Sequence, residues 1–403
     1  MKRIVIVDHF SQTPDEVGNN RFLYLAELLC QKGYAVEIIT TDFSHKAKKT
    51  RQTDPKLLEA LPYQFTMLPE PGYPKNVCLQ RFYSHYVFGK NLKKYMEQMD
   101  KPDVVYVATP SLDAAGVAAA YCKKEHVPFV VDVQDVWPEA FKLVFHIPLV
   151  SDLVFAPMTI AANRMYRQAD HIVAVSETYK ERGLHSNAKD PEGLCVYLGT
   201  DLSAFDEKAR AHTVDKPEGE IWIAYAGTLG HSYNIEIILD ALDRLPEEAT
   251  RQLVFKVLGD GPLMERFQKR AATCKVRVDF LGRLEYAKMT GYMRQADIAV
   301  NPIVKGAAQS IINKHADYAA AGLPVVSTQE CPEYRALLDT YGCGINCPPE
   351  DAQAVADALE TLLRDADLRR AMGQNSRRMA EERFDRANTY FRIVEVLEEG
   401  IVL

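Results

Sequence analysis

Short β-branched runs alternate with amphipathic stretches from one end of the chain to the other. In the first half these runs cover residues 3–7, 35–40, 104–109, 128–133, 171–176 and 194–198. A second series covers residues 221–226, 254–258, 276–281, 298–302, 324–327 and 344–347. Helical stretches, such as residues 21–32 and 114–125, lie between the runs. The alternation predicts an α/β fold with two parallel sheets in series, each built from strands and crossover helices.

The chain length also favours two domains, because 403 residues exceed one ordinary core and fall short of three. Residues 206–220 are charged and contain Pro217 and Gly219, so we interpret them as a linker. This places an N-terminal domain at residues 1–205 and a C-terminal domain at residues 206–384. The last segment, residues 385–403, carries an apolar helical face, and we expect it to pack back on the first domain.

Charge and cysteine spacing exclude several classes of protein. Residues 1–190 carry 23 Lys and Arg against 22 Asp and Glu, and the remainder carries 25 against 33, giving +1 and −8. The acidic half argues against nucleic acid as a partner. The eight cysteines show no metal-ligand spacing, so we expect reduced thiols and no metal site. The apolar run after Arg3 is too short for a signal peptide, which predicts a first strand and a cytoplasmic protein.

One segment carries a specific chemical signal: Gln309 to Val326 runs from a loop into a helix and then into a strand. A helix beginning near Ser310 would direct unpaired N–H groups and a partial positive charge at a ligand beyond its end. Phosphate suits such a place. Lys314 and Asp317 would then supply a cation for a diphosphate and a carboxylate for ribose hydroxyls.

This segment resembles the donor-site signature of the family 4 glycosyltransferases, in which two acidic residues separated by seven others precede a Gly-x-Pro-Val-Val run. Gln309 and Asp317 occupy the acidic positions here. The resemblance implies a GT-B fold, in which two Rossmann-like domains face each other across a cleft. It also implies that Gln309 contacts the donor sugar, that Asp317 contacts the ribose, and that the backbone at Ser310 and Ile311 contacts the diphosphate.

Other segments are similar to the same family along almost the whole chain. Residues 226–230, which include Gly227 and Thr228, resemble its glycine-rich donor turn, and Gly259 and Arg283 follow the next two strands. Family members often carry an Arg and a Lys after the first glycine turn. This chain has residues 231–235 there instead, so Lys314 would carry more of the diphosphate charge.

In the first domain, two positions resemble parts of the cleft. Gly18, at a predicted helix start, would place backbone N–H groups beside the donor or acceptor. Asp135 precedes Val-Trp-Pro, which resembles a signature of the branch that builds capsule, O-antigen and exopolysaccharide. Because open α/β sheets bind ligands at strand carboxyl ends, we assign Asp135 to the acceptor side, where it orients the attacking hydroxyl or caps the next helix.

Together these features predict a retaining, metal-independent hexosyl- or N-acetylhexosaminyltransferase with no cofactor. Lys314, Asp135 and Gln309 would be its catalytic residues. Its donor would be a nucleotide diphosphate-sugar, with UDP preferred on family frequency, and its acceptor a polyprenyl-diphosphate-linked glycan. The alternatives are a non-catalytic partner of a transferase and a sugar-nucleotide epimerase of the same fold. A dehydrogenase is disfavoured because no G-x-G-x-x-G follows the first strand.

The long apolar stretch at residues 143–162 leaves two interpretations open. Polar residues and prolines interrupt it, so a membrane-spanning helix is not expected. It is either a core helix or a patch that rests weakly on the inner face of the cytoplasmic membrane or holds a polyprenyl chain. The second interpretation would draw on the basic residues Lys46, Lys48, Lys49 and Arg51.

Overall fold

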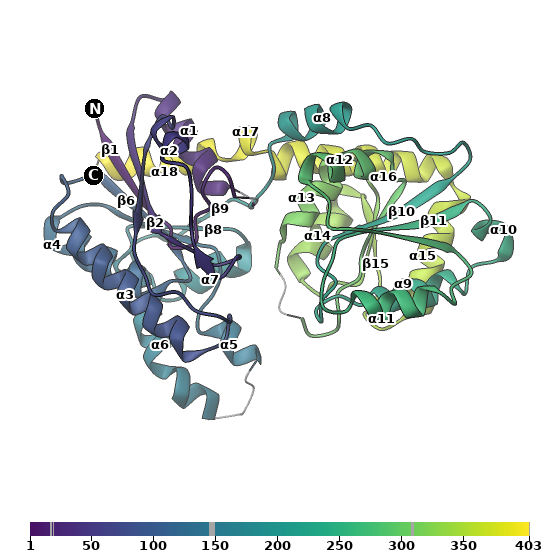
Figure 1. Cartoon of the computed structure of the whole chain (residues 1–403), viewed down its shortest axis with the longest axis horizontal. Coiled ribbons are helices and arrows are strands. Elements are labelled where there is room, and N and C mark those ends of the chain that lie inside the picture. The colour runs from purple at the N-terminus through teal and green to yellow at the C-terminus, as the bar shows by residue number, and fades with distance from the viewer. Residues whose placement is uncertain (17, 19, 145–149, 308–309, 403) are drawn as a thin grey trace. The chain divides into compact units, whose positions relative to one another are not determined.

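The computed structural model describes the whole chain except residues 17, 19, 145–149, 308, 309 and 403. The chain forms two compact units (Figure 1). The first unit comprises Met1–Tyr197 and Tyr390–Leu403, and the second comprises Leu198–Thr389. The chain therefore leaves the first unit once and returns to it at its C-terminal end.

A seven-stranded sheet forms the centre of the first unit, and all its strand pairs are parallel. Its order is β5-β2-β1-β6-β7-β8-β9. The strands are β1 (Arg3–Val7), β2 (Ala35–Thr41), β5 (Gln64–Leu68), β6 (Val104–Thr109), β7 (Phe129–Val133), β8 (His171–Ala174) and β9 (Leu194–Cys195). The β-branched runs form strands because their side chains pack on both covered faces of a parallel sheet.

Helices cover both faces of this sheet, and a small hairpin of β3 (Phe43–Ser44) and β4 (Lys49–Thr50) lies beyond β2. One core gathers α3 (Leu79–Met96), α4 (Leu112–Glu125) and the second half of α6 (Val150–Gln168). The other gathers α1 (Arg21–Gln31) and α18 (Phe391–Val402), so the C-terminal helix packs on the first sheet. The remaining helices are α2 (Pro55–Glu59), α5 (Glu139–Val144) and α7 (Glu177–Leu184).

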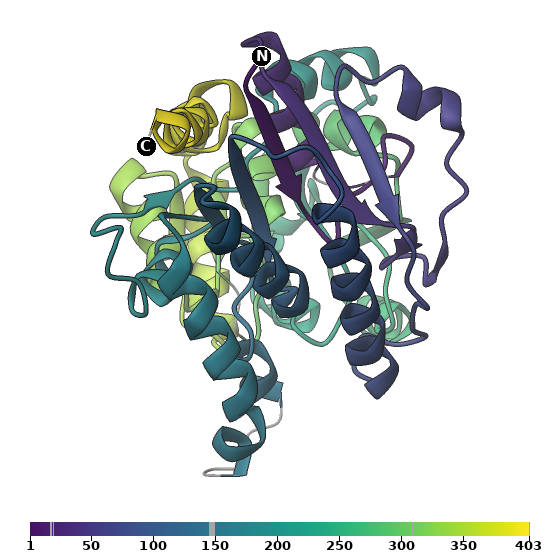
Figure 2. The same cartoon turned by 90° about the vertical axis from the view of Figure 1, so that its left-hand side faces the viewer.

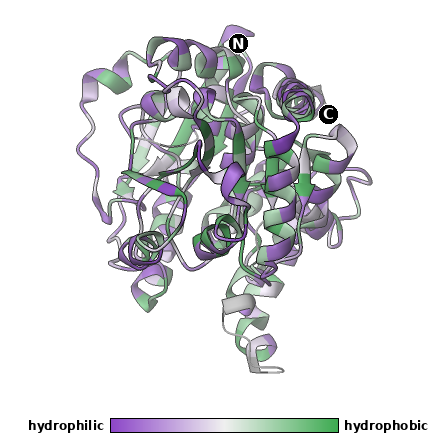
Figure 3. Cartoon of the chain, turned by 90° about the vertical axis from the view of Figure 1, so that its right-hand side faces the viewer, coloured by the Kyte–Doolittle hydropathy of each residue, from purple (hydrophilic) through white to green (hydrophobic). Residues whose placement is uncertain are grey.

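The second unit repeats this plan with six parallel strands in the order β12-β11-β10-β13-β14-β15. They are β10 (Ile221–Ala226), β11 (Leu253–Leu258), β12 (Arg277–Gly282), β13 (Ile298–Asn301), β14 (Val325–Ser327) and β15 (Gly344–Asn346). Figure 3 shows hydrophobic colour on these central strands and hydrophilic colour on the outer sides of the helices. The core therefore lies between the sheet and its helices.

The helices of the second unit follow its strands. They are α8 (Leu202–Ala211), α9 (Ile235–Leu242), α10 (Glu247–Thr250), α11 (Met264–Ala271), α12 (Tyr286–Gln295), α13 (Asn313–Ala320), α14 (Pro332–Tyr341), α15 (Ala352–Arg364), α16 (Ala366–Met379) and α17 (Arg386–Thr389). A π-helical turn at Ala380–Phe384 continues α16.

The linker predicted at residues 206–220 is wrong in its first part, because residues up to Ala211 belong to α8. This helix buries Leu202, Phe205 and Ala209 against the second unit. Leu202 and Phe205 precede Asp206, so the sequence from Asp206 onward does not contain the full apolar face of the helix. Asp206 itself pairs with Arg377 at 2.8 Å.

The apolar stretch at residues 143–162 divides into two parts, and residues 145–149 lie outside the described residues. In the second half of α6, Ala162, Met165 and Tyr166 are buried in the core. In the first half, Leu153 is 78% exposed, and Val154 and Ile160 are exposed as well. Figure 2 shows this end of α6 extending past the neighbouring helices. A core helix therefore accounts for only part of the stretch.

The basic residues between positions 46 and 51 differ in their exposure to solvent. Lys46 and Lys49 are exposed, but Arg51 is buried and pairs with Glu16 at 3.1 Å. Arg51 therefore stabilises the loop itself. Among the described residues, none of the helices combines the length and apolar character that crossing a bilayer requires.

Candidate functional site

The predicted donor residues of the second unit gather at the carboxyl ends of its strands. Gly227 follows β10, Gly259 follows β11, and Arg283 comes directly after β12. The strand order reverses between β10 and β13, which is where open α/β sheets form a ligand crevice. The helix that carries Lys314 and Asp317 follows β13. The topology therefore brings these residues to one edge of one sheet.

Two glycine turns line this edge in close contact. The Gly227 N–H donates to the Leu258 carbonyl at 2.9 Å. Gly227 and Gly259 have φ values of +150° and +158°, which L side chains rarely adopt. A Cβ added at Gly259 would lie 1.7 Å from the Gly227 carbonyl oxygen. Both turns therefore need glycine for backbone packing, whatever ligand approaches them.

Lys314 lies buried in the first turn of α13, with 8% of its surface exposed. Its Nζ lies over the rings of Tyr225 and Tyr233, 4.3 Å and 3.9 Å from their centroids. Among the residues that the structure describes, this nitrogen has no hydrogen-bond partner. Burial holds the pKa of Lys314 well below its ordinary value. The side chain is thus a buried amine with ring faces on one side and, among the described residues, no ion-pair partner, so a bound anion would favour its charged form.

The surroundings of Lys314 favour an anion as the ligand. A buried unpaired ammonium is costly, and only a negative charge or hydrogen-bond acceptors offset that cost. Helix α13 begins at Asn313, three residues later than predicted, and its first N–H groups add partial positive charge. The Ser310 Oγ, just before the helix, is also buried and has no hydrogen-bond partner in the described ranges. Two unsatisfied polar groups therefore lie at the start of α13.

His315 fixes the start of α13 and is not available for proton transfer. Its ring stacks on Tyr334 with centroids 3.5 Å apart. Its Nδ1 accepts from the Ile312 N–H at 3.3 Å, and its Nε2 lies 3.3 Å from the Asn301 amide nitrogen. Burial holds the pKa of His315 well below its ordinary value, so the ring is neutral.

Asp317 lies one turn further along α13 and is held by a chain of hydroxyl groups. The Tyr286 hydroxyl donates to its Oδ1 at 2.7 Å, and Thr200 Oγ1 lies 3.2 Å from the same tyrosine oxygen. Burial raises the pKa of Asp317 to about 6, while the tyrosine hydrogen bond opposes that shift. At neutral pH the group is an ionised acceptor with one oxygen already oriented.

The other predicted residues lie in several settings. Thr228 is exposed, and its carbonyl accepts from the Tyr225 hydroxyl at 2.7 Å. Arg283 is exposed, and Ile311 is buried. Gln309 lies outside the described residues. Gly18 is exposed and belongs to the first unit, as does Asp135.

Asp135 follows β7 at the carboxyl edge of the first sheet and is half-buried. Its Oδ1 accepts from the Val136 N–H at 2.8 Å, and its carbonyl accepts from Thr109 Oγ1 at 3.2 Å. Burial raises the pKa of Asp135. Hydrogen bonds from the Val136 N–H and the Trp137 side chain orient the Asp135 carboxylate and oppose the effect of burial on its pKa.

Three tyrosines complete the site and were not predicted. Tyr225 lies near the end of β10, and Tyr233 lies in the loop that follows. Tyr286 begins α12, far along the chain from Asp317. The available signal was weak: Tyr233 lies in the segment that replaces the expected Arg and Lys pair.

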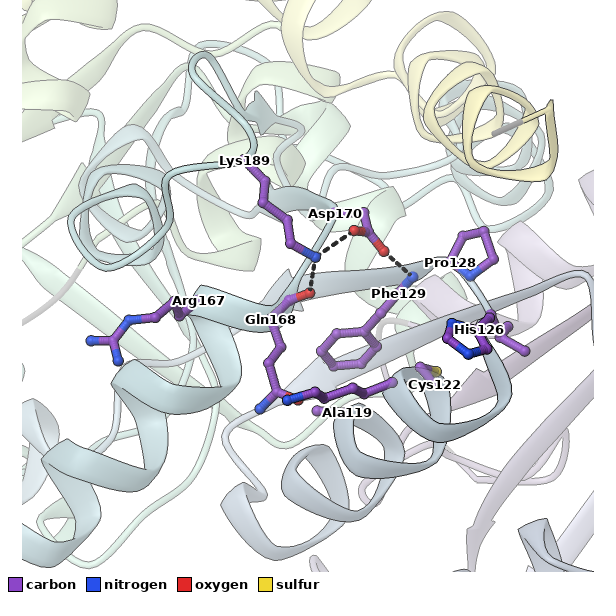
Figure 4. A pocket seen from close by; sticks show the side chains of 11 residues that line it. Ala119, Cys122, His126, Pro128, Phe129, Arg167, Gln168, Asp170 and Lys189 are labelled. Atoms are coloured by element: carbon purple, nitrogen blue, oxygen red, sulfur yellow. Dashed lines mark hydrogen bonds and ion pairs between the residues drawn. The ribbon is translucent and has the colours of Figure 1, made fainter.

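A hollow of about 610 Å³ in the first unit lies away from this chemistry (Figure 4). It lies at the amino ends of β7 and β8, the opposite edge from the one that binds ligands in open sheets. Its polar groups satisfy one another, since Lys189 contacts Asp170 and Asp170 accepts from the Phe129 N–H. These two residues are therefore engaged with each other and with the backbone of β7.

Acidic and metal-binding side chains do not gather at the candidate site. In the part of the chain that the structure describes, no three His, Cys, Asp or Glu side chains are grouped as metal ligands.

Two family models match the chain, one on each side of residue 205. The model described as Glycosyltransferase Family 4 matches residues 18–202, and the model described as Glycosyl transferases group 1 matches residues 206–379. The second match contains the glycine turns and helix α13.

Individual relatives are distant. An uncharacterized glycosyltransferase of Methanocaldococcus jannaschii is 22% identical over 55% of this chain and 56% of its own length. An N-acetylgalactosaminyltransferase of Campylobacter jejuni, whose name includes an undecaprenol-diphosphate-linked acceptor, is 23% identical over 46% of this chain and 48% of its own length. These matches thus span about half of each relative.

Similarity of fold extends over the whole chain. HepE of Anabaena, whose crystal structure is a complex with UDP, superposes with a TM-score of 0.71 at 16% identity. The match covers 99% of this chain and all of HepE. The two parallel sheets give the chain a GT-B fold, and its two halves are similar to the Glycosyltransferase Family 4 and Glycosyl transferases group 1 models.

Proposed function

We propose that this protein transfers a sugar, with retention of configuration, from a nucleotide diphosphate-sugar to a hydroxyl of a lipid-linked glycan in bacterial surface polysaccharide synthesis. The observation that carries the proposal is the buried Lys314 Nζ, which has no hydrogen-bond partner within the described part of the chain and lies at the N-terminus of α13. A diphosphate would supply the missing negative charge. UDP is the preferred nucleotide, which the UDP complex of HepE supports by analogy of fold.

The proposed chemistry follows from where charge develops. The bond between the anomeric carbon and the departing diphosphate breaks, and negative charge grows on the phosphate oxygens. Lys314 and the first N–H groups of α13 stabilise that charge. The acceptor hydroxyl attacks the same face of the sugar and forms the new glycosidic bond, and its proton passes to the departing phosphate. Asp317 binds the ribose, and Asp135 orients the acceptor hydroxyl.

In this proposal the protein supplies the positive charge that a metal ion supplies in other transferases. Lys314 approaches the diphosphate from a water-poor site, where a charged contact is stronger than in water. The reaction then proceeds without a metal or another cofactor, and the transferred group is a hexose or an N-acetylhexosamine.

The acceptor side of the proposal rests on the first unit. The name of the Campylobacter relative includes a diphosphate-linked polyprenol acceptor. The exposed apolar end of α6 and the exposed Lys46 and Lys49 would give weak contact with an anionic membrane surface, each lysine contributing about 1 kcal/mol. The protein would then work at the cytoplasmic face of the membrane.

Two other functions predict different behaviour. A non-catalytic partner subunit would bind a transferase without turning over a donor, which the amide at position 309 and the missing Arg and Lys pair would permit. An epimerase would need several acid and base groups around one sugar, whereas the described His and Asp side chains nearest Lys314 along α13 are a neutral histidine and one aspartate.

The first test is a thermal-shift screen of the purified protein against UDP, GDP, ADP and CMP, repeated with Lys314→Ala. We expect one nucleoside diphosphate at 100 times its Kd to stabilise the protein by about 2.7 kcal/mol. The shift should disappear in Lys314→Ala, because the diphosphate loses its cation. It should persist in Lys269→Ala, which removes an exposed lysine of α11. Stabilisation by none of the nucleotides would favour the partner subunit.

A further inference from the structure

A second group of cations lies at the carboxyl edge of the first sheet. Strand order reverses there between β1 and β6, and Asp135 follows the next strand. Arg81, in the first turn of α3, and Lys48, in the hairpin loop, approach the same tyrosine. The Arg81 Cζ lies 5.6 Å and the Lys48 Nζ 4.6 Å from the ring centroid of Tyr73. We call His45, Lys48, Arg81 and His85 the Arg81 cluster.

Arg81 is held between aromatic rings. Its guanidinium lies 4.6 Å from the ring centroid of Trp137 and 5.7 Å from that of Phe10. It donates to the Asn76 carbonyl at 2.9 Å and lies 3.4 Å from His85 Nε2. Planar stacking leaves the remaining N–H groups of an arginine free for a second planar or tetrahedral acceptor.

The cluster has more positive charge than its surroundings neutralise. Within the described residues, neither Arg81 nor Lys48 has a carboxylate within 4.0 Å. Glu70 is engaged by His9 at 3.1 Å and by Ser84 at 2.8 Å. Asp135 attracts Arg81 only from beyond ion-pair distance.

The pKa shifts of the side chains in the Arg81 cluster agree with unpaired positive charge there. Burial lowers the pKa of Lys48, and the charge of Arg81 adds to the effect. Burial and the neighbouring cations lower the pKa of His45 to about 4, and burial, His9 and Arg81 lower that of His85. Arg81 and Lys48 therefore face neutral imidazoles, and the carboxylates of Glu70 and Asp135 act on the cluster only from a distance, which leaves both cations available to an anion.

A row of packed aromatic rings extends from the Arg81 cluster. The rings of Trp137 and Phe141 are 4.7 Å apart, and Phe141 lies 5.9 Å from both Phe82 and Phe155. Beyond them are exposed apolar side chains on two helices: Leu79, Tyr83 and Tyr86 on α3, and Leu153 and Val154 on α6. A ligand with an anionic end and a hydrocarbon end would match both parts.

We propose that the Arg81 cluster binds the phosphate group of an isoprenoid phosphate or diphosphate, whose first isoprene units lie along the exposed apolar side chains of α3 and α6. This inference rests on the proposed function and identifies where its lipid-linked acceptor is held. Arg81 and Lys48 bind the phosphate oxygens, and the site ends close to Asp135. The cluster thus positions the acceptor by the group that joins its glycan to its lipid.

Trp137 provides a direct measurement. The chain has two tryptophans, and the other, Trp222, is buried in the second unit. In a Trp222→Phe background, the emission of Trp137 alone reports binding. Farnesyl diphosphate is a suitable probe because it carries a diphosphate and three isoprene units and dissolves in water. Parallel titrations use inorganic pyrophosphate and phosphatidylglycerol vesicles at equal phosphate concentration.

We expect saturable binding of farnesyl diphosphate, weaker binding of pyrophosphate, and a loss of affinity of about tenfold or more in Arg81→Gln. Lys48→Gln should also weaken binding. Lys94→Gln, which changes an exposed lysine near the other end of α3, should leave the Kd unchanged. Equal affinity for the probe in Arg81→Gln, or a Trp137 response to vesicles alone, would overturn the proposal.

Farnesyl diphosphate could also bind at the donor site through its diphosphate, so the experiment must distinguish binding at the two sites. The Trp137 response should therefore persist in Lys314→Ala, and the nucleotide-induced thermal shift should persist in Arg81→Gln. A nucleotide shift without farnesyl diphosphate binding would overturn the acceptor site and leave the transferase standing. Farnesyl diphosphate binding without any nucleotide shift would contradict the transferase instead.

Discussion

The Asp317 carboxyl group links the donor site to folding stability. Its pKa is about 6 in the folded chain against an ordinary value of 3.8, because it is buried. The folded state therefore holds this proton more tightly, and stability falls as pH rises from about 4 to about 6. Relative to the native chain, Asp317→Asn should gain up to about 2 kcal/mol between these two pH values.

Urea unfolding at pH 4 and pH 7 measures this difference. Tyr286→Phe is the matched variant, since it removes the hydroxyl that donates to Asp317 and keeps the ring. Without that hydrogen bond the pKa of Asp317 should rise further, and the pH-dependent loss of stability should extend to higher pH. A stability difference between Asp317→Asn and the native chain that is the same at both pH values would contradict the buried carboxyl.

Sequence alone predicted Lys314 and Asp317 in one site, because Asp317 lies three positions after Lys314 on a helix. It did not indicate what surrounds them. Tyr225 and Tyr233 come to Lys314 from another strand and loop, and Tyr286 reaches Asp317 from a different helix. Such partners depend on packing between distant segments, which no local spacing encodes.

At the scale of elements, the glycine turns after β10 and β11 form one backbone-to-backbone contact. In Gly259→Ala, the added methyl group meets the Gly227 carbonyl at 1.7 Å, and φ is +158°. We expect this variant to lose at least about 2 kcal/mol of unfolding free energy, since both strain and displacement contribute. Donor binding should also weaken, because Gly227 adjoins Lys314.

Gly116 provides the control. It is exposed within α4, and a Cβ there would meet no atom within 4 Å. Gly116→Ala should therefore stabilise the chain by about 1 kcal/mol, as expected for alanine inside a helix. Denaturant unfolding compares the two variants. A Gly259→Ala protein as stable as the native chain would show that the turns are not in contact.

Most elements of the two sheets could be predicted, and the exceptions have physical causes. Buried parallel strands are β-branched runs, which is why β1, β6, β10 and others begin and end close to their predicted limits. Strand β5 (Gln64–Leu68) was missed, since its edge position leaves it with a mixed, partly exposed sequence. The domain boundary that we predicted at Asp206 falls within helix α8.

On the scale of the whole molecule, the repeated strand pattern predicted two similar sheets. The apolar face of the last segment predicted a helix that buries itself, and Tyr390, Ile393 and Leu397 are buried in the first unit. What the pattern could not provide is the identity of ligands. The charges that select a donor and an acceptor come from a few residues of each unit, and those residues are brought together only by folding.

The central claim is that this chain alone breaks a sugar–diphosphate bond at Lys314. The most direct measurement is the release of nucleoside diphosphate from UDP-sugars and GDP-sugars by the purified protein without an acceptor. We predict slow release from one donor class, faster release when a polyprenyl-diphosphate-linked glycan is added, and loss of both in Lys314→Ala. Release from none of the donors, with or without acceptor, would contradict catalysis by this chain and favour a non-catalytic partner subunit.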